Sequence, residues 1–319
     1  MTHLDESKPK APDAEYAAEI ATRVIGCAPT SVRRFTGMVH YVFGVAFADR
    51  PSIVVRIGDA SARTRLAGAL RLSAFLRPRG VPLPAILADD IQAELPWMAM
   101  ERLPGTDLGA VITALSKPQL DQIAAEVARA QAITARTGSA RLYGYASRSE
   151  RAPHAAWSHV LEDSLSRSRA RIASAELFDV GLVEIVRAEF AALRSQIDEV
   201  APTPFLHDTT TKNVLVAPDG RFSGIVDVDD LCFGDARYPA ALTLAVLEAY
   251  HDGPVEYVSA WLRAAGQKND RVFQLYVAVF LLDLMGEHGH AFNGNERPSE
   301  PAERAALLRA FRRRAYTKL

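Results

Sequence analysis

The first third of the chain mixes helical spacing of apolar residues with short β-rich runs, whereas the rest shows mainly helical spacing. In the first third, apolar residues three and four apart predict two helices, over 13–26 and 61–77. Short runs rich in β-branched and aromatic residues predict five strands, over 31–35, 41–47, 52–57, 85–88 and 97–102. This order of elements is typical of a small β-rich lobe.

Helical spacing dominates after Leu103-Pro104-Gly105, a turn sequence at which we place the domain boundary. The predicted N-terminal lobe is 1–103, with 1–12 as a flexible leader, and the predicted C-terminal lobe is 104–319. Helices are predicted in the second lobe over 107–115, 119–134, 154–174, 183–200, 236–250, 255–264, 271–287 and 300–313. The predicted fold class is therefore α+β in two lobes, and a cleft between lobes is a common place for a ligand site.

One β-hairpin interrupts the helical lobe. Two apolar runs, 214–216 and 222–226, flank the turn sequence Pro218-Asp219-Gly220. If the hairpin pivots near Gly220, Asn213 and Asp227 lie opposite each other at its open end, with Cβ atoms about 5 Å apart. A register shifted by one residue would instead point the two side chains to opposite faces.

Oxygen ligands gather at the open end of this hairpin. An amide oxygen from Asn213 and a carboxylate from Asp227 can share one cation, and such ligands suit magnesium. Asp208, five residues before Asn213, enters the same end. The alternative reading is that these residues only cap the hairpin and its loop.

The composition narrows the class of protein. With 319 residues, 49% of them hydrophobic, and a net charge of −1, the chain is an ordinary globular protein without the basic surface that binds nucleic acid or anionic membrane. Two cysteines, Cys27 and Cys232, build no disulfide framework, and the polar N-terminus lacks the apolar core of a secretion signal. We therefore expect a cytoplasmic protein. The motif GxxxxGK(S/T) is absent, which excludes a P-loop nucleoside triphosphatase.

The block from Asp208 to Asp235 resembles a known family. Asp208, Asn213 and Ile225-Val226-Asp227, followed by Gly234-Asp235, are similar to the catalytic and metal-binding loops of the aminoglycoside phosphotransferase family, which includes choline, fructosamine, homoserine and macrolide kinases. The resemblance runs from residue 29 to the end of the chain. It implies a protein-kinase-like fold and transfer of the γ-phosphate of ATP or GTP to a hydroxyl of a small molecule.

The resemblance also implies roles for the C-terminal residues. Asp208 would be the catalytic aspartate that accepts or orients the acceptor hydroxyl, while Asn213 and Asp227 would hold the magnesium ions that bridge the nucleotide phosphates. Lys212 either reaches a phosphate as a point charge or is a solvated loop lysine.

Other family roles fall on the N-terminal lobe. Gly37 lies where the family has its nucleotide-covering loop. Arg56 stands on the strand where the family places a basic residue, often lysine, that pairs the α- and β-phosphates, and an arginine fork can bind phosphate oxygens bidentately. The alternative is that Arg56 lies on the solvated face of an edge strand. Residues 98–105 resemble the inter-lobe hinge, whose backbone near Met100, Glu101 and Arg102 would bind the purine. The alternative is a core strand that ends in a Pro-Gly turn.

Two departures from the family pattern stand out. The family usually has His-Gly-Asp, whereas His207 occupies the glycine position here and is expected to be structural. The helix predicted over 61–77 contains no acid to pair with Arg56, so that either Asp59 takes this role or the lobe is built differently. These departures support an alternative function, a nucleotide-binding, pseudokinase-like module with little or no transfer activity.

The acceptor is predicted to be a small molecule. Only six residues separate Asp227 from Gly234, which leaves no room for the long activation segment with which protein kinases bind peptides. An aminoglycoside-like antibiotic and a metabolite are both compatible with the pattern. Asp283 and Glu287, four apart on one predicted helix face, either contribute to an acidic acceptor pocket or belong to a plain amphipathic helix.

Overall fold

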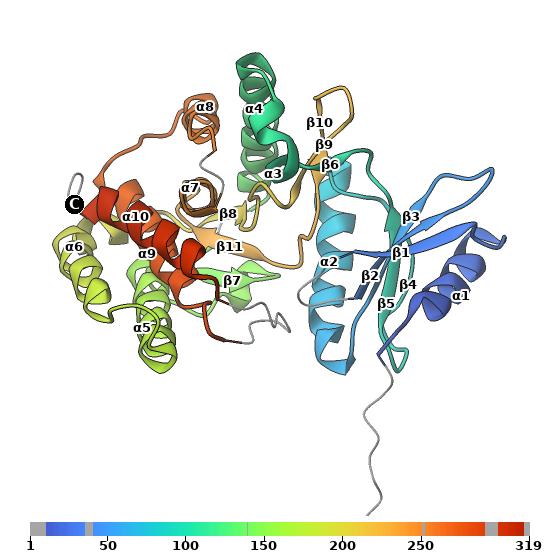
Figure 1. The fold of residues 1–319 in the computed structure, drawn as a ribbon, viewed down its shortest axis with the longest axis horizontal. Helices are drawn as coiled ribbons and strands as arrows, with labels where there is room; N and C mark the ends of the chain where they lie inside the picture. Colours follow the sequence, from blue (N-terminus) through green and yellow to red (C-terminus); the bar gives the residue numbers. More distant parts are fainter. Residues whose placement is uncertain (1–10, 36–40, 139, 251–252, 291–298, 316–319) are drawn as a thin grey trace, which may run out of the picture. The chain divides into compact units, whose positions relative to one another are not determined.

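The computed structural model describes residues 11–35, 41–138, 140–250, 253–290 and 299–315 (Figure 1). Contacts divide the chain into two units, one formed by residues 1–67 and 85–102 and the other by residues 68–84 and 103–319. The segment 68–84, which begins in the middle of the helix Arg63–Leu76, therefore belongs to the C-terminal unit. Gly37, assigned above to a nucleotide-covering loop, lies outside the described residues.

The N-terminal unit is an antiparallel sheet with a helix packed against it. The helix, α1 (Ala14–Ile25), is capped by Asp13, which accepts a hydrogen bond from the Tyr16 amide (3.0 Å), and it stops at Gly26, whose φ is 83°. The sheet order is β1-β2-β3-β5-β4, and the predicted strands are confirmed as β1 (Ser31–Phe35), β2 (Tyr41–Ala46), β3 (Ile53–Ile57), β4 (Ile86–Asp90) and β5 (Trp97–Glu101).

The C-terminal unit is mainly helical and is built around α9 (Arg271–Met285), which is buried on almost every side (Figure 1). Helix α2 (Arg63–Leu76) begins in the first unit and ends in this one. The other helices are α3 (Leu108–Val111), α4 (Lys117–Ala135), α5 (Trp157–Ala175), α6 (Gly181–Asp198), α7 (Tyr238–Tyr250), α8 (Glu256–Ala264) and α10 (Pro301–Ala315). Among the described helices, none is long and apolar enough to cross a membrane.

Two three-stranded sheets complete the C-terminal unit. One has the order β10-β9-β6 and contains the predicted hairpin, and the other has the order β7-β11-β8. Their strands are β6 (Thr106–Asp107), β7 (Gly144–Ala146), β8 (Thr203–Leu206), β9 (Val214–Val216), β10 (Phe222–Ile225) and β11 (Leu231–Gly234). The sequence pattern did not predict the second sheet, because its strands are three or four residues long and, unlike those of the hairpin, are not joined by a local turn sequence that would mark them.

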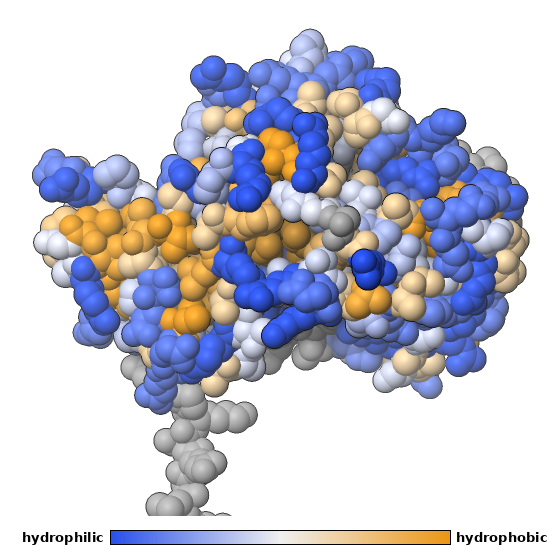
Figure 2. Space-filling model, turned by 180° about the vertical axis from the view of Figure 1, so that it is seen from behind, coloured by the Kyte–Doolittle hydropathy of each residue, from blue (hydrophilic) through white to orange (hydrophobic). Residues whose placement is uncertain are grey.

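Hydrophilic residues cover much of the face that Figure 2 shows, and hydrophobic ones reach that surface in patches. The large apolar side chains are enclosed in separate clusters, one under the N-terminal sheet and two in the C-terminal unit. Each unit thus has its own core, as the prediction of an α+β chain with a small β-rich part and a larger helical part requires.

Candidate active site

The loop between β8 and β9, residues 207–213, is anchored by hydrogen bonds to one buried glutamine. Gln131 on α4 accepts a hydrogen bond from the Leu206 amide (2.9 Å) and donates to the Leu206 carbonyl (2.8 Å). It also donates to the Thr209 hydroxyl (3.0 Å). Because both backbone groups of Leu206 are satisfied by one side chain, the point at which the loop leaves the strand is fixed.

Asp208 stands at the exposed edge of this loop, which bonds to itself around the aspartate. One carboxylate oxygen of Asp208 accepts from the Thr210 hydroxyl (2.8 Å), and its carbonyl accepts from the Asn213 amide nitrogen (3.0 Å). Thr211 is buried and its carbonyl accepts from Gly109 at the start of α3 (3.0 Å). The three consecutive threonines are therefore structural, and the exposed carboxylate is the group that the loop presents.

The hairpin register differs by one residue from the prediction. A bulge between Phe222 and Gly224 shifts the pairing, so that Ile225 pairs with Val214 and the Val226 amide donates to the Asn213 carbonyl (2.9 Å). Asp227 is thus one position beyond the residue opposite Asn213, and our expected direct pairing was wrong. Asp227 has a φ of 63°, in the left-handed region. The alternation of side chains along a strand therefore does not determine the face to which Asp227 points.

The donor set at this end of the hairpin fits a magnesium ion. The nitrogen of the Asn213 amide is used by the Asp208 carbonyl, which leaves the amide oxygen as the atom for a cation. Asp227 offers an exposed carboxylate. Magnesium is commonly held by one or two protein oxygens, with waters and substrate phosphates completing the shell. In the described part of the chain, no cluster of three or more His, Cys, Asp or Glu residues forms a self-sufficient metal site.

The loop after β10 is positioned by the close approach of α2. A Cβ built on Gly68 would lie 2.3 Å from the carbonyl oxygen of Asp229, far inside contact distance. Only glycine therefore lets the helix touch the backbone of residues 226–230. The sequence contains this glycine in the middle of a predicted helix, where it is unfavourable, and that local conflict is the signal that could have pointed to the contact.

Acidic residues face the Asp208 loop from the end of α9. Burial, the neighbouring carboxylate of Asp283 and that of Asp208 raise the pKa of Glu287 to about 7, against the opposing charges of Arg171 and Lys212. Asp283 itself accepts from Arg167 (3.3 Å) and Ser168 (3.3 Å). The two acids are thus near the candidate catalytic aspartate. Helix α9 ends at Met285, so Glu287 lies just beyond it.

His207 packs as an aromatic ring. Its ring centroid is 4.7 Å from that of Tyr145, edge to face, and 6.1 Å from that of Tyr238 and 6.2 Å from that of Phe280. Burial lowers the pKa of His207 although Asp208 and Asp283 oppose this, and its Nδ1 is buried with no hydrogen-bond partner among the described residues. The structural role expected for His207 agrees with this packing. Tyr145, 41% exposed beside the loop, was missed because β7 was not predicted.

Arg56 is buried in the N-terminal sheet, at 6% exposure. Its strand, β3, pairs with β2 on one side and β5 on the other. The alternative of a solvated edge-strand arginine is therefore wrong, because β3 has no free edge. Asp59 caps the short helix Ala60–Ala62 by accepting from the Ser61 amide (2.8 Å).

The hinge residues make contacts within the N-terminal sheet. Glu101 bonds twice to Ala85, through its backbone amide (2.8 Å) and through its carboxylate (3.1 Å). The Arg102 guanidinium lies 5.6 Å from the ring centre of Phe35. Met100 is on β5, paired with Val54. Structural contacts thus account for the Glu101 and Arg102 side chains. Lys212 belongs to the other unit, where it is exposed.

Comparison with family models matches residues 39–276 to the phosphotransferase enzyme family. Similar solved structures include an apo thermostable mutant of aminoglycoside phosphotransferase APH(4)-Ia, with a TM-score of 0.67, 15% identity, and coverage of 94% of this chain and 100% of that one. A ternary complex of such a mutant with ADP and hygromycin B has a TM-score of 0.66 and 14% identity, over 95% and 99% of the two chains. A comparison with curated proteins finds no match.

ADP-bound aminoglycoside phosphotransferase APH(2'')-Ib has a TM-score of 0.65 and 15% identity, over 95% of this chain and 98% of that one. At such low identity these likenesses show the fold. The predicted kinase-like α+β fold is confirmed by them, with its small antiparallel sheet and its larger helical part.

Proposed function

The chain belongs to the phosphotransferase enzyme family, and from that premise we propose that it moves the γ-phosphate of ATP or GTP to a hydroxyl of a small molecule. The observation that carries this proposal is the loop around Asp208, in which hydrogen bonds of Thr209, Thr210 and Asn213 fix the backbone while the carboxylate is presented at the surface. Such preorganisation is what phosphoryl transfer asks of a protein, because the reaction depends on positioning and charge rather than on covalent work.

In the proposed reaction, the acceptor oxygen attacks the γ-phosphorus in line, the bond from that phosphorus to the bridging oxygen breaks, and the nucleoside diphosphate leaves. The hydroxyl proton passes to the carboxylate of Asp208, whose second oxygen is held by Thr210. Asn213 and Asp227 hold magnesium, which neutralises phosphate charge when bound. Arg56 and Lys212 add positive charge for the phosphates, and Gly37 and the backbone of residues 100–102 contact the nucleotide.

The acceptor we propose is a small hydroxyl compound that also carries a cationic group, either an aminoglycoside-like antibiotic or a metabolite. The acids Asp208 and Glu287 lie near each other and would attract a cation, and the ring of Tyr145, which is 41% exposed, would contact the cationic group. One of the similar structures named above is a ternary complex with ADP and hygromycin B.

A second candidate function is nucleotide binding with little or no transfer. The observation that favours it is the absence of any acid from α2, where the family has the partner of the basic strand residue. The two candidates differ in one measurable respect, which is turnover in the presence of an acceptor.

The test is a screen of nucleotide consumption over aminoglycosides, macrolides, amino alcohols and sugars, with ATP and GTP, with and without magnesium. We expect magnesium-dependent turnover with at least one acceptor. The Asp208→Ala variant should lose about 100-fold or more of that turnover, the usual contribution of a positioned base. Nucleotide binding without turnover over the whole panel would favour the second candidate, and equal turnover by the variant would contradict the role of Asp208.

A further inference from the structure

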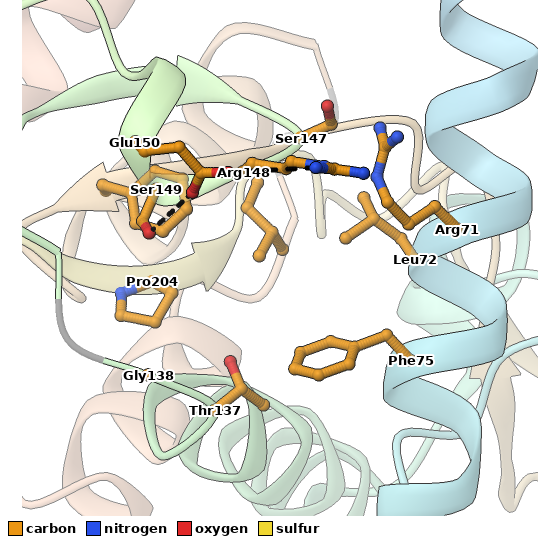
Figure 3. A pocket seen from close by; sticks show the side chains of 12 residues that line it. Arg71, Leu72, Phe75, Thr137, Gly138, Ser147, Arg148, Ser149, Glu150 and Pro204 are labelled. Carbon is orange, nitrogen blue, oxygen red and sulfur yellow. Dashed lines mark hydrogen bonds and ion pairs between the residues drawn. The ribbon is translucent and has the colours of Figure 1, made fainter.

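A cavity of about 250 Å³ lies within the C-terminal unit, and its lining includes none of the residues assigned above to catalysis, nucleotide or metal (Figure 3). Its walls come from α2, the end of α4, the connection after β7, and strands β8 and β11. The lining residues are Arg71, Leu72, Phe75, Thr137, Gly138, Ser147, Arg148, Ser149, Glu150, Pro204, Leu231 and Phe233. We call this cavity the α2 pocket.

The α2 pocket combines an apolar floor with a polar rim. Leu72, Phe75 and Pro204 supply part of the apolar surface, and the strand residues Leu231 and Phe233 are almost fully buried beneath it. Hydroxyl and guanidinium groups stand around the apolar part (Figure 3). Ligand pockets characteristically have this composition, in which apolar walls provide affinity and a few polar groups fix orientation.

The rim has more positive charge than its own acid balances. Arg148 reaches Glu150 only at 4.0 Å, and both side chains are more than half exposed, so this ion pair is weak. The Nε of Arg71 is buried and has no hydrogen-bond partner among the described residues. In Figure 3 the side chains of Arg71 and Arg148 extend toward each other along one edge of the pocket. Two guanidinium groups at one edge attract an anion, and charge-assisted hydrogen bonds from arginine to a carboxylate or phosphate are strong.

We propose that the α2 pocket binds a small organic anion, namely a single apolar ring bearing a carboxylate or a phosphate. The ring would rest on Leu72 and Phe75, and the anionic group would bond to Arg71 and Arg148. A cavity of this size is below the usual range for drug-sized ligands, which favours one ring over a larger molecule.

Two elements that line the α2 pocket, α2 and β11, adjoin the loop that carries Asp227. Gly68, one turn before Leu72 on α2, touches the backbone of Asp229, and β11 begins directly after that loop. A ligand in the α2 pocket would therefore contact both α2 and β11, the two elements that adjoin residues 226–230. If Asp227 holds magnesium, as the proposed function states, then any effect of the anion on the affinity for magnesium-bound nucleotide would be matched by an equal effect of that nucleotide on the affinity for the anion.

Binding is tested by calorimetric titration of the full chain with benzoate, phenyl phosphate, benzyl alcohol and inorganic phosphate, without nucleotide. We expect the two ring anions to bind. Benzyl alcohol, which lacks the charge-assisted hydrogen bonds, and inorganic phosphate, which lacks the apolar ring, should bind at least about tenfold more weakly. Comparison of benzoate with phenyl phosphate identifies the preferred anionic group. Because no turnover is measured, failure here is distinct from failure of the proposed enzyme activity.

The double variant Arg71→Met, Arg148→Met should weaken ring-anion binding at least about tenfold. Arg65→Met is the matched control, since Arg65 is an exposed arginine on the same helix that does not line the pocket. Arg148→Met alone covers the case in which the double variant does not fold, because Arg148 is largely exposed. The proposal is overturned if neither ring anion binds, if benzyl alcohol binds as well as they do, or if Arg148→Met binds as the Arg65→Met control does.

Discussion

The loop that carries Asp208 and the loop that carries Asp227 lie at one end of the same hairpin but are held by different means. In the first, side chains do the holding, since Gln131 clamps Leu206 and Thr210 bonds to Asp208. The second is positioned by backbone contact, since α2 approaches the Asp229 carbonyl at Gly68, its one residue without a side chain. The first loop should therefore be sensitive to loss of polar groups, and the second to any added carbon.

The largest effect on stability is expected at Gln131. Gln131→Met removes three hydrogen bonds and leaves the amide and carbonyl of Leu206 buried without partners, which should cost about 3 kcal/mol in the free energy of unfolding. Urea unfolding measures this change. Gln122→Met is the control, because Gln122 is exposed on the same helix. Equal stability of the two variants would show that the clamp does not hold the loop.

Gly68→Ala tests the backbone contact of the second loop. Helix propensity alone predicts that alanine stabilises a helix interior by about 0.5–1 kcal/mol. The contact with Asp229 predicts the opposite sign, a loss of about 2 kcal/mol, since overpacking forces the backbone to shift. Gly138→Ala, with no atom within 4 Å of the added carbon, is the control. A thermal shift upward for Gly68→Ala would contradict the close approach.

His207 distinguishes ring packing from a chemical role. His207→Gly, which restores the family's usual residue, should lose about 2 kcal/mol because it empties the space beside Tyr145 and Tyr238. His207→Phe keeps the ring and should retain both stability and activity. Inactivity of a well-folded His207→Phe would show that the imidazole itself is needed.

Stability of the wild type and of His207→Phe should depend on pH differently. Burial lowers the pKa of His207, so folding disfavours its protonated form, and its contribution to stability is complete above the unfolded pKa of about 6.5. That contribution is lost as the pH falls below this value. His207→Phe should therefore reduce the fall in melting temperature between pH 8 and pH 5.5.

The smallest effect is expected at Glu287, whose pKa of about 7 lies above its ordinary value. An acid with a raised pKa contributes its stability below the unfolded pKa and loses it as the pH rises toward 7. Glu287→Gln should therefore stabilise the protein by about 1 kcal/mol at pH 8 and by less at pH 5. The exposed Glu94→Gln should show no such difference, and an equal gain at both pH values would contradict the raised pKa.

The sequence was most informative for elements that are long enough to show a repeating pattern of apolar residues. Helix α1 and the five strands of the N-terminal sheet follow from local pattern. The hairpin was also found, but its register was not, because the bulge between Phe222 and Gly224 leaves no mark in the alternation. Strands β7 and β11 escaped for a related reason, since each spans three or four residues and gains its partner from a distant segment.

The candidate site divides in the same way. Asp208, Asn213 and Asp227 were chosen from their spacing within a single stretch of about thirty residues, so local sequence was enough to propose them. Gln131 was not, because its bonds to Leu206 join residues that are 75 positions apart. Tyr145 was missed with its strand. The groups that present the proposed chemistry are thus readable in sequence, whereas the groups that position them depend on tertiary contacts.

The most direct test of the account compares Asp208→Ala with Asp227→Ala in two assays, binding of a non-hydrolysable ATP analogue with magnesium and transfer of phosphate to an acceptor identified by the screen. Asp208→Ala should keep nucleotide affinity within about threefold of wild type, less than 1 kcal/mol, while losing transfer. Asp227→Ala should lose the magnesium dependence of binding as well as transfer. Full transfer activity in Asp208→Ala, or unchanged magnesium-dependent binding in Asp227→Ala, would contradict the assignment of catalysis to one loop and metal to the other.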